Sequence, residues 1–222
     1  MNLGNANFIM QRVREAYKSG YKSNNKAYST TANADLVDEL DVEVSALGNP
    51  KFQKRYDDMV RDIDRPNYQV SPFETGRMIW TSQAPNYFER GNCLEMAMAS
   101  IFLAVNDYNA DAAKTYYVAI TPPGDHAFCL IGASPNWASV SAMSGTGIVI
   151  DPWLNICCLA DDYSQRATEK LGKWHRNGKR IAVYDDQDNL WWADTAGTYR
   201  ANFLTAPLSN IPANAVNLRH SY

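Results

Sequence analysis

The sequence predicts an α+β domain in which helices come first and a mainly antiparallel sheet follows. In the first half of the chain, apolar residues recur at the three- and four-residue spacing of amphipathic helices. The second half instead contains short runs rich in β-branched and aromatic residues, bounded by Gly, Pro, Asn and Asp, as strands are. Because the two kinds of element are not interleaved, α+β is favoured over an alternating βαβ fold.

Each element is predicted from its own pattern. Helical spacing is found in three early segments and in a fourth that begins at a cysteine: 5–18, 35–47, 51–64 and the stretch from Cys93. Strand composition is found in a short early run and in four later ones: 77–81, 115–121, 126–132, 147–151 and 179–185. Residues 195–222 have no pattern that assigns an element.

A Ser, Asn and Thr-rich stretch at residues 19–34 separates the first helix from the rest of the chain. Such composition is typical of a connecting segment that does not pack. We therefore expect residues 1–34 to form a flexible N-terminal or export segment and residues 35–222 to form the main domain.

Composition argues against two classes of partner. The formal net charge is −3 and the basic residues are dispersed, so the chain lacks the basic stripe that phosphate backbones require, and no nucleic acid partner is expected. No apolar run approaches the roughly 20 residues that span a bilayer. The N-terminus also lacks the basic-then-apolar layout of a secretory signal peptide. We expect a soluble chain made in the cytoplasm, while export through a machine that leaves no cleavable signal stays open.

The cysteines are expected to be reduced thiols, because two of them are adjacent and the chain is too large to need disulfides. They are Cys93, Cys129, Cys157 and Cys158. A zinc site is not expected, since the chain has no CxxC pair and its histidines are not at ligand spacing to the thiols. The histidines are His126, His175 and His220. No metal or other cofactor is predicted.

Cys93 is the first candidate for chemistry. It stands at the start of the predicted helix, directly after Gly91 and Asn92. Free backbone N–H groups and the helix dipole favour the thiolate there, which is the nucleophilic form. The alternative is ordinary core filling, because cysteine is among the most buried residue types.

A thiol nucleophile needs a general base and a residue that orients this base. His126 begins one apolar strand and Asp151 ends the next. If these strands pair antiparallel, the two residues become neighbours across the ladder. For both His126 and Asp151, the alternative is that the side chain only caps or opens a turn. Asp125 is a poorer orienter, because strand pleating would direct it away from His126.

The start of the Cys93 helix also offers backbone donors for an oxyanion, to which the side chain of Asn92 or Gln83 could add another. For Gln83 a surface loop is the alternative. Glu95 is most simply explained as a carboxylate that stabilises the helix start. His175 lies among cations in a turn-like segment and His220 near the terminus, so both are expected to be solvated.

Three blocks in order, RGNCLE at 90–95, DHAFCLIG at 125–132 and VIDPW at 149–153, carry a family resemblance. Together they resemble the papain-like Cys-His-Asp superfamily of bacterial toxins and secreted effectors, above all the deamidase domain of Pasteurella-type mitogenic toxins. The resemblance covers about residues 76–160. One departure is Tyr87, which stands where papain-type proteases have an oxyanion glutamine.

The resemblance implies a papain-like catalytic domain with Cys93 as nucleophile, His126 as general base and acid, and Asp151 as orienter. It implies hydrolysis of a glutamine side-chain amide in a host or target protein, by a monomer made in a bacterial cytoplasm and then secreted, with an export chaperone as a further partner. An effector-type cysteine protease is the main alternative. A transglutaminase, an arylamine N-acetyltransferase-like enzyme (from Arg90, Gly91 and Glu95) and a non-catalytic binding protein rank lower.

Overall fold

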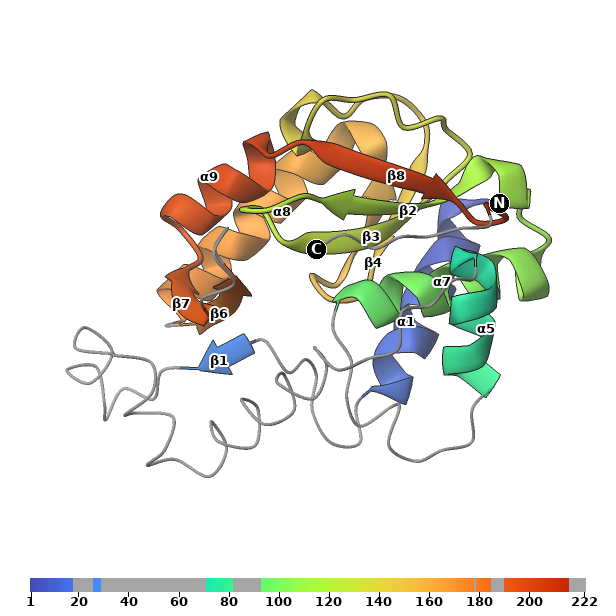
Figure 1. The fold of residues 1–222 in the computed structure, drawn as a ribbon, viewed down its shortest axis with the longest axis horizontal. Coiled ribbons are helices and arrows are strands. Elements are labelled where there is room, and N and C mark those ends of the chain that lie inside the picture. Colours follow the sequence, from blue (N-terminus) through green and yellow to red (C-terminus); the bar gives the residue numbers. More distant parts are fainter. Residues whose placement is uncertain (18–25, 29–70, 82–92, 178, 185–189, 216–222) are drawn as a thin grey trace.

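The centre of the fold is an open antiparallel sheet of five strands in the order β5-β4-β3-β2-β8 (Figure 1). The computed structural model describes residues 1–17, 26–28, 71–81, 93–177, 179–184 and 190–215. The strands are β2 (Thr115–Ile120), β3 (His126–Ile131), β4 (Ile148–Asp151), β5 (Ile156–Leu159) and β8 (Leu208–Pro212). With the helices around it, this sheet confirms the α+β class.

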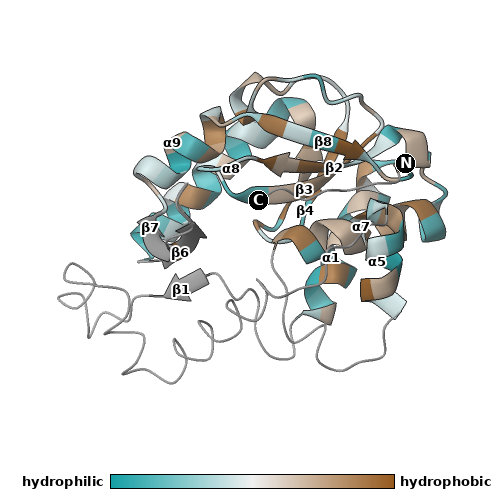
Figure 2. Cartoon of the chain, viewed as in Figure 1, coloured by the Kyte–Doolittle hydropathy of each residue, from teal (hydrophilic) through white to brown (hydrophobic). Residues whose placement is uncertain are grey.

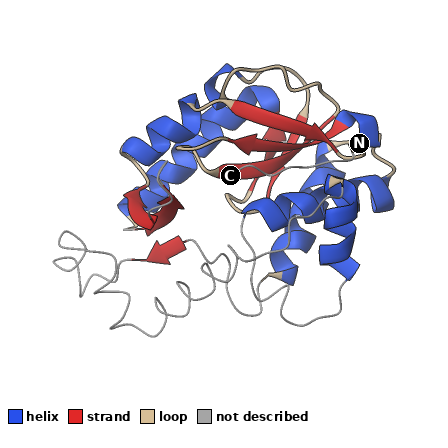
Figure 3. Ribbon diagram, viewed as in Figure 1, coloured by secondary structure: helices blue, strands red, loops and turns tan. Residues whose placement is uncertain are grey.

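Helices cover both sides of this sheet. The helices are α1 (Leu3–Ala16), α5 (Pro72–Thr81), α7 (Cys93–Tyr108), α8 (Ala160–Arg176) and α9 (Thr198–Thr205), with 3-10 turns η2 (Ala112–Lys114) and η3 (Val140–Ala142). Figures 1 and 3 show α1, α5 and α7 grouped on one side, and α8 and α9 on the other. All six residues of β3 and all four of β4 are buried, as expected for strands covered on both faces. No helix within the described ranges is both long and apolar enough to cross a membrane.

A second, three-stranded antiparallel sheet has the order β1-β6-β7. Its strands are β1 (Lys26–Tyr28), β6 (Lys179–Tyr184) and β7 (Leu190–Asp194). β6 follows α8 directly in the chain, and β7 leads into α9. The small sheet thus connects the two helices that cover the same side of the large sheet.

Helix α7 is the most buried helix of the core, and α5 packs closely against it. Ser71 accepts a hydrogen bond from the Glu74 backbone at 3.2 Å, which satisfies a free N–H group at the start of α5. Gly76 lets the two helices approach, since a Cβ atom there would overlap the backbone oxygen of Met98. Figure 2 shows apolar residues on the strands and on these helices. The strand expected at 77–81 is therefore wrong, because packing on α7 outweighs the local β-type composition.

Helix α1 differs from the flexible segment expected for residues 1–34. Its first turn is capped by Asn2, which accepts from the Asn5 backbone at 2.9 Å. Its apolar side is fully buried in the same core as α7, through Ala6, Ile9 and Val13. Residues 3–16 are thus part of the folded core, whereas the boundary at residue 34 lies outside the described residues.

The other expected elements have mixed outcomes. Helices at 5–18 and from Cys93 are confirmed, as are strands at 115–121, 126–132, 147–151 and 179–185. Helices expected at 35–47 and 51–64 lie outside the described residues. Helix α8 was not expected, and His175 lies in its last turn, exposed, rather than in a loop. Within 195–222, where no element was assigned, the structure has α9 and β8.

We predict that Gly76→Ala lowers the free energy of unfolding by about 2 kcal/mol, because the added methyl group meets backbone that cannot move aside. Urea unfolding followed by circular dichroism measures the change. The matched control is Gly172→Ala in α8, whose methyl group would meet only the end of the Arg176 side chain at 3.6 Å. This control should be neutral or stabilising by up to about 1 kcal/mol. Equal effects of the two substitutions would contradict the close approach of α5 and α7.

Candidate catalytic site

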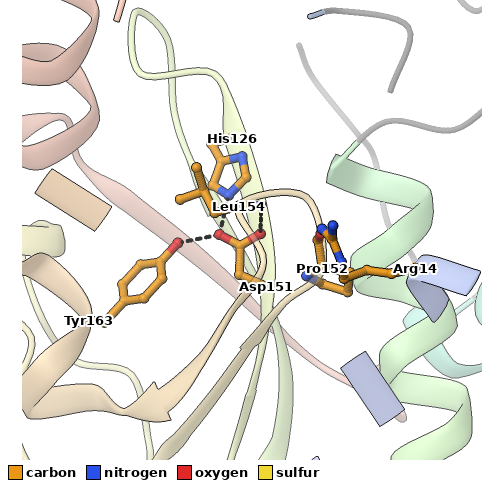
Figure 4. A network of polar contacts seen from close by, with 6 residues as sticks. All are labelled: Arg14, His126, Asp151, Pro152, Leu154 and Tyr163. Atoms are coloured by element: carbon orange, nitrogen blue, oxygen red, sulfur yellow. Dashed lines mark hydrogen bonds and ion pairs between the residues drawn. The ribbon is translucent and has the colours of Figure 1, made fainter. Parts of the chain in front are cut away.

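The pairing of β3 with β4 brings His126 and Asp151 together. The two strands are antiparallel, with Cys129 opposite Ile150, so the start of β3 lies beside the end of β4. His126 Nε2 and Asp151 Oδ2 are 2.8 Å apart, and both side chains are fully buried (Figure 4). The juxtaposition expected from strand order is thereby observed.

Asp151 is held by two further donors (Figure 4). The Tyr163 hydroxyl, from the first turn of α8, donates to Oδ2 at 2.8 Å, and the Leu154 backbone N–H donates to Oδ1 at 2.9 Å. Burial acts to raise the pKa of Asp151, but the charge of His126 and the three hydrogen bonds outweigh it and leave the pKa below its ordinary value. Asp151 is therefore a carboxylate that fixes the orientation of the imidazole.

Aromatic rings enclose the imidazole of His126. Its ring centroid lies 4.9 Å from that of Trp153, 5.3 Å from Phe203 and 6.4 Å from Phe128. The buried Nδ1 atom has no hydrogen-bond partner among the described residues. Since Nε2 is engaged by Asp151, Nδ1 is the nitrogen that is left to exchange a proton.

Cys93, the first residue of α7, lies next to the backbone of the residue that follows this histidine. The backbone amides of Leu94 and of Ala127, the residue after His126, hydrogen-bond to its thiol. The thiol therefore sits where the start of α7 meets the start of β3. Only 6% of the residue is exposed, so it is part of the core as well as of the site.

The electrostatics at Cys93 differ from the sequence expectation. Burial raises the pKa of the thiol, and the nearby charges of Asp125 and Asp151 raise it further. The two backbone donors act in the opposite direction but do not outweigh these effects. The expected thiolate at the helix start is therefore wrong for this structure, and the resting form is the thiol. Cys93 could act as a nucleophile only after losing this proton.

Asp125 was expected to point away from the triad. It instead belongs to the turn before β3, with a positive φ of 35°, a conformation that Asp tolerates better than most residues. It lies close enough to Cys93 for its charge to raise the pKa of the thiol, and burial raises the pKa of Asp125 itself. Asp125 is thus an electrostatic neighbour of the nucleophile.

Two tyrosines at the site were missed from the sequence. Tyr163 holds Asp151, and Tyr199 of α9 is buried near the same groups. For Tyr163 the sequence does contain a signal, which is the helical spacing of the residues on the buried side of α8: Tyr163, Ala167, Leu171 and Trp174. That spacing would have directed Tyr163 toward the sheet.

Helix α1 also supports the site. Arg14 Nη1 donates to the backbone oxygen of Pro152 at 2.6 Å, directly after Asp151 (Figure 4). The turn that carries Leu154 and Trp153 is thereby fixed from the N-terminal side as well. The first helix contributes to the geometry of the candidate triad.

The remaining candidates have simpler outcomes. Asn92, Gln83 and His220 lie outside the described residues, so their expected roles stay predictions. Glu95 is in the first turn of α7 and is buried. All four cysteines are free thiols. Across the described parts of the chain, no group of three or more His, Cys, Asp or Glu residues is placed to hold a metal ion.

Comparisons with protein-family models, curated proteins and solved structures gave no match. A functional assignment therefore depends on the residues and geometry of the site itself.

We predict that Asp151→Asn destabilises the protein by about 3 kcal/mol at pH 7, because it removes the charged partner of buried donors. The pKa of Asp151 is lowered in the folded state. Its stabilisation is thus complete above the ordinary value of 3.8 and is lost as the pH falls through the lowered value. Urea unfolding at several pH values should show the cost of the substitution shrinking toward acid. The exposed Asp162→Asn, which loses only a 3.8 Å pair with Arg166, should cost at most about 0.5 kcal/mol.

We predict that Asp125→Asn makes Cys93 alkylate several-fold faster with iodoacetamide near pH 8. Removing the negative charge lowers the pKa of the thiol and raises the thiolate fraction. Mass spectrometry of the Cys93 peptide measures the rate. Cys157, which is half-buried with a pKa raised to about 11, serves as the internal control and should keep its rate. An unchanged rate at Cys93 would show that Asp125 does not act on the thiol.

Proposed function

We propose that this protein is a thiol-dependent amide hydrolase with a papain-like arrangement of Cys93, His126 and Asp151, and that it deamidates glutamine in a target protein. The observation that supports the proposal best is the fully buried pair of His126 and Asp151, together with the hydrogen bond that the Cys93 thiol receives from the backbone of Ala127, the residue after His126. A nucleophile, a base and an orienter are the three parts that acyl transfer needs.

The first half of the reaction forms a thioester. His126 Nδ1 takes the proton from Cys93 Sγ, and the sulfur attacks the carboxamide carbon to give a tetrahedral oxyanion. The C–N bond then breaks as the imidazolium returns its proton to nitrogen, and ammonia leaves. Asp151 stabilises the imidazolium throughout, because its carboxylate accepts from Nε2.

The second half releases the product. His126 takes a proton from water, and the resulting hydroxide attacks the thioester carbon. The C–S bond breaks, the thiolate regains the proton from the imidazolium, and the glutamine has become glutamate. The aromatic wall of Trp153 and Phe203 around His126 keeps bulk water from the base and strengthens its bond to Asp151.

The small exposure of Cys93 supports a side-chain amide over a main-chain amide. A carboxamide at the end of a slender side chain can approach a thiol of which 6% of the residue is exposed. A main-chain amide is flanked by chain on both sides and needs an open groove. This favours deamidation over proteolysis, while the toxin-like role, secretion and a host target follow from the resemblance alone and stay predictions.

We predict that the protein releases ammonia from glutamine-containing peptides or proteins and raises the mass of each target by about 1 Da, because an amide becomes an acid. Intact-mass analysis is the measurement. Cys93→Ala and His126→Ala should abolish the change, whereas Cys157→Ala, the matched cysteine control, should retain it.

The same spectra distinguish the alternatives. Two fragments would indicate a cysteine protease, and an added amine would indicate a transglutaminase. Activity that survives Cys93→Ala would contradict every version of the thiol mechanism.

A further inference from the structure

We propose that the Tyr199 hydroxyl donates a hydrogen bond to the carbonyl oxygen of the bound acyl group and stabilises the oxyanion that forms when Cys93 attacks. The inference rests on the proposed function, since it assigns a donor to that same reaction. It gives the site an oxyanion donor from the described part of the chain.

The position of α9 places Tyr199 next to the catalytic groups. The segment directly after α9 is joined to the residue after β2, because the Thr121 N–H donates to the Pro207 oxygen at 2.9 Å. Its middle lies against the turn before His126, since a Cβ atom on Gly124 would be 3.2 Å from the Asn202 oxygen. α9 thus packs on the segment that delivers the catalytic histidine.

A row of rings continues from the histidine to Tyr199. The ring centroid of Phe203 is 5.3 Å from that of His126, and the ring centroid of Tyr199 is 6.2 Å from that of Phe203. Tyr199 and Phe203 are four residues apart and so share one side of the helix. Tyr199 is therefore one helical turn away from the residue that packs on the base.

The hydroxyl of Tyr199 is buried without a hydrogen-bond partner among the described residues, and the residue is 1% exposed. A buried hydroxyl without a partner lowers the stability of the fold, so its presence needs an explanation. Burial, and then the charges of Asp125, of Cys93 when it is a thiolate and of Asp151, raise the pKa of Tyr199 well above its ordinary value. The phenol therefore stays protonated and keeps a hydrogen that it can donate, near the thiol where the oxyanion charge develops.

Tyr163 provides a matched comparison. It is the other buried tyrosine of the cluster, with its ring centroid 6.3 Å from that of Phe203, but its hydroxyl is used by Asp151. Tyr163 is thus a positioning residue that acts through Asp151 and His126. Tyr199 is assigned to the substrate oxygen instead.

Two reagents separate these roles at Cys93. Acylation by p-nitrophenyl acetate passes through a tetrahedral oxyanion, whereas alkylation by iodoacetamide is a direct displacement that forms none. We predict that Tyr199→Phe slows acylation by about 100- to 1,000-fold, the range typical for loss of one oxyanion donor, and leaves alkylation unchanged. Tyr163→Phe should slow both reactions by a similar factor. Mass spectrometry of the Cys93 peptide gives both rates in the full-length protein.

Controls keep the two proposals apart. His126→Ala should slow both reactions, and if it does not, the proposed function fails. If it does but Tyr199→Phe keeps the acylation rate of the unsubstituted protein, or slows both reactions equally, only the role of Tyr199 is overturned. Thermal unfolding checks the fold, and Tyr199→Phe should be at least as stable as the unsubstituted protein, because it removes a buried hydroxyl that has no described partner.

Discussion

The buried hydrogen bond between His126 and Asp151 is the constraint on which the site depends. A carboxylate with no exposure is tolerated only if its oxygens are satisfied, and Asp151 meets this with His126, Tyr163 and Leu154. These partners come from β3, from α8 and from the turn after β4. Because the buried carboxylate of Asp151 needs all of these hydrogen bonds, it fixes how β3, β4 and α8 are placed relative to one another.

Burial also determines the state of the Cys93 thiol at the start of α7. The start of α7 brings Cys93 to the start of β3, but the packing that places it there also removes it from water. Burial and the negative charges of Asp125 and Asp151 then outweigh the helix start and its amides. In the proposed reaction, a thiol that is protonated at rest needs a base in every turnover, so the orientation of His126 would influence the chemistry more than the position of Cys93 on its helix.

The apolar pattern of the sequence predicted an element correctly where one or both faces of that element are clearly apolar. The strands of 126–132 and 147–151 and the helix from Cys93 were predictable for this reason. Residues 77–81 were not, because Ile79, Trp80 and Thr81 suit a strand while packing of Gly76 against Met98 requires a helix. Tyr163 and Tyr199 could not be assigned to the site from the sequence, because each comes from a helix that follows the catalytic blocks in the chain and reaches the site only through tertiary packing.

The sequence by itself determined the α+β class, the three candidate catalytic residues and the meeting of His126 with Asp151, since strand order and antiparallel pairing follow from local chemistry. Only the tertiary structure decided the protonation of Cys93, the part played by Asp125 and the tyrosines, and the inclusion of α1 in the core. These depend on burial and on charges brought together from distant parts of the chain, and neither burial nor distance is a property of a local pattern.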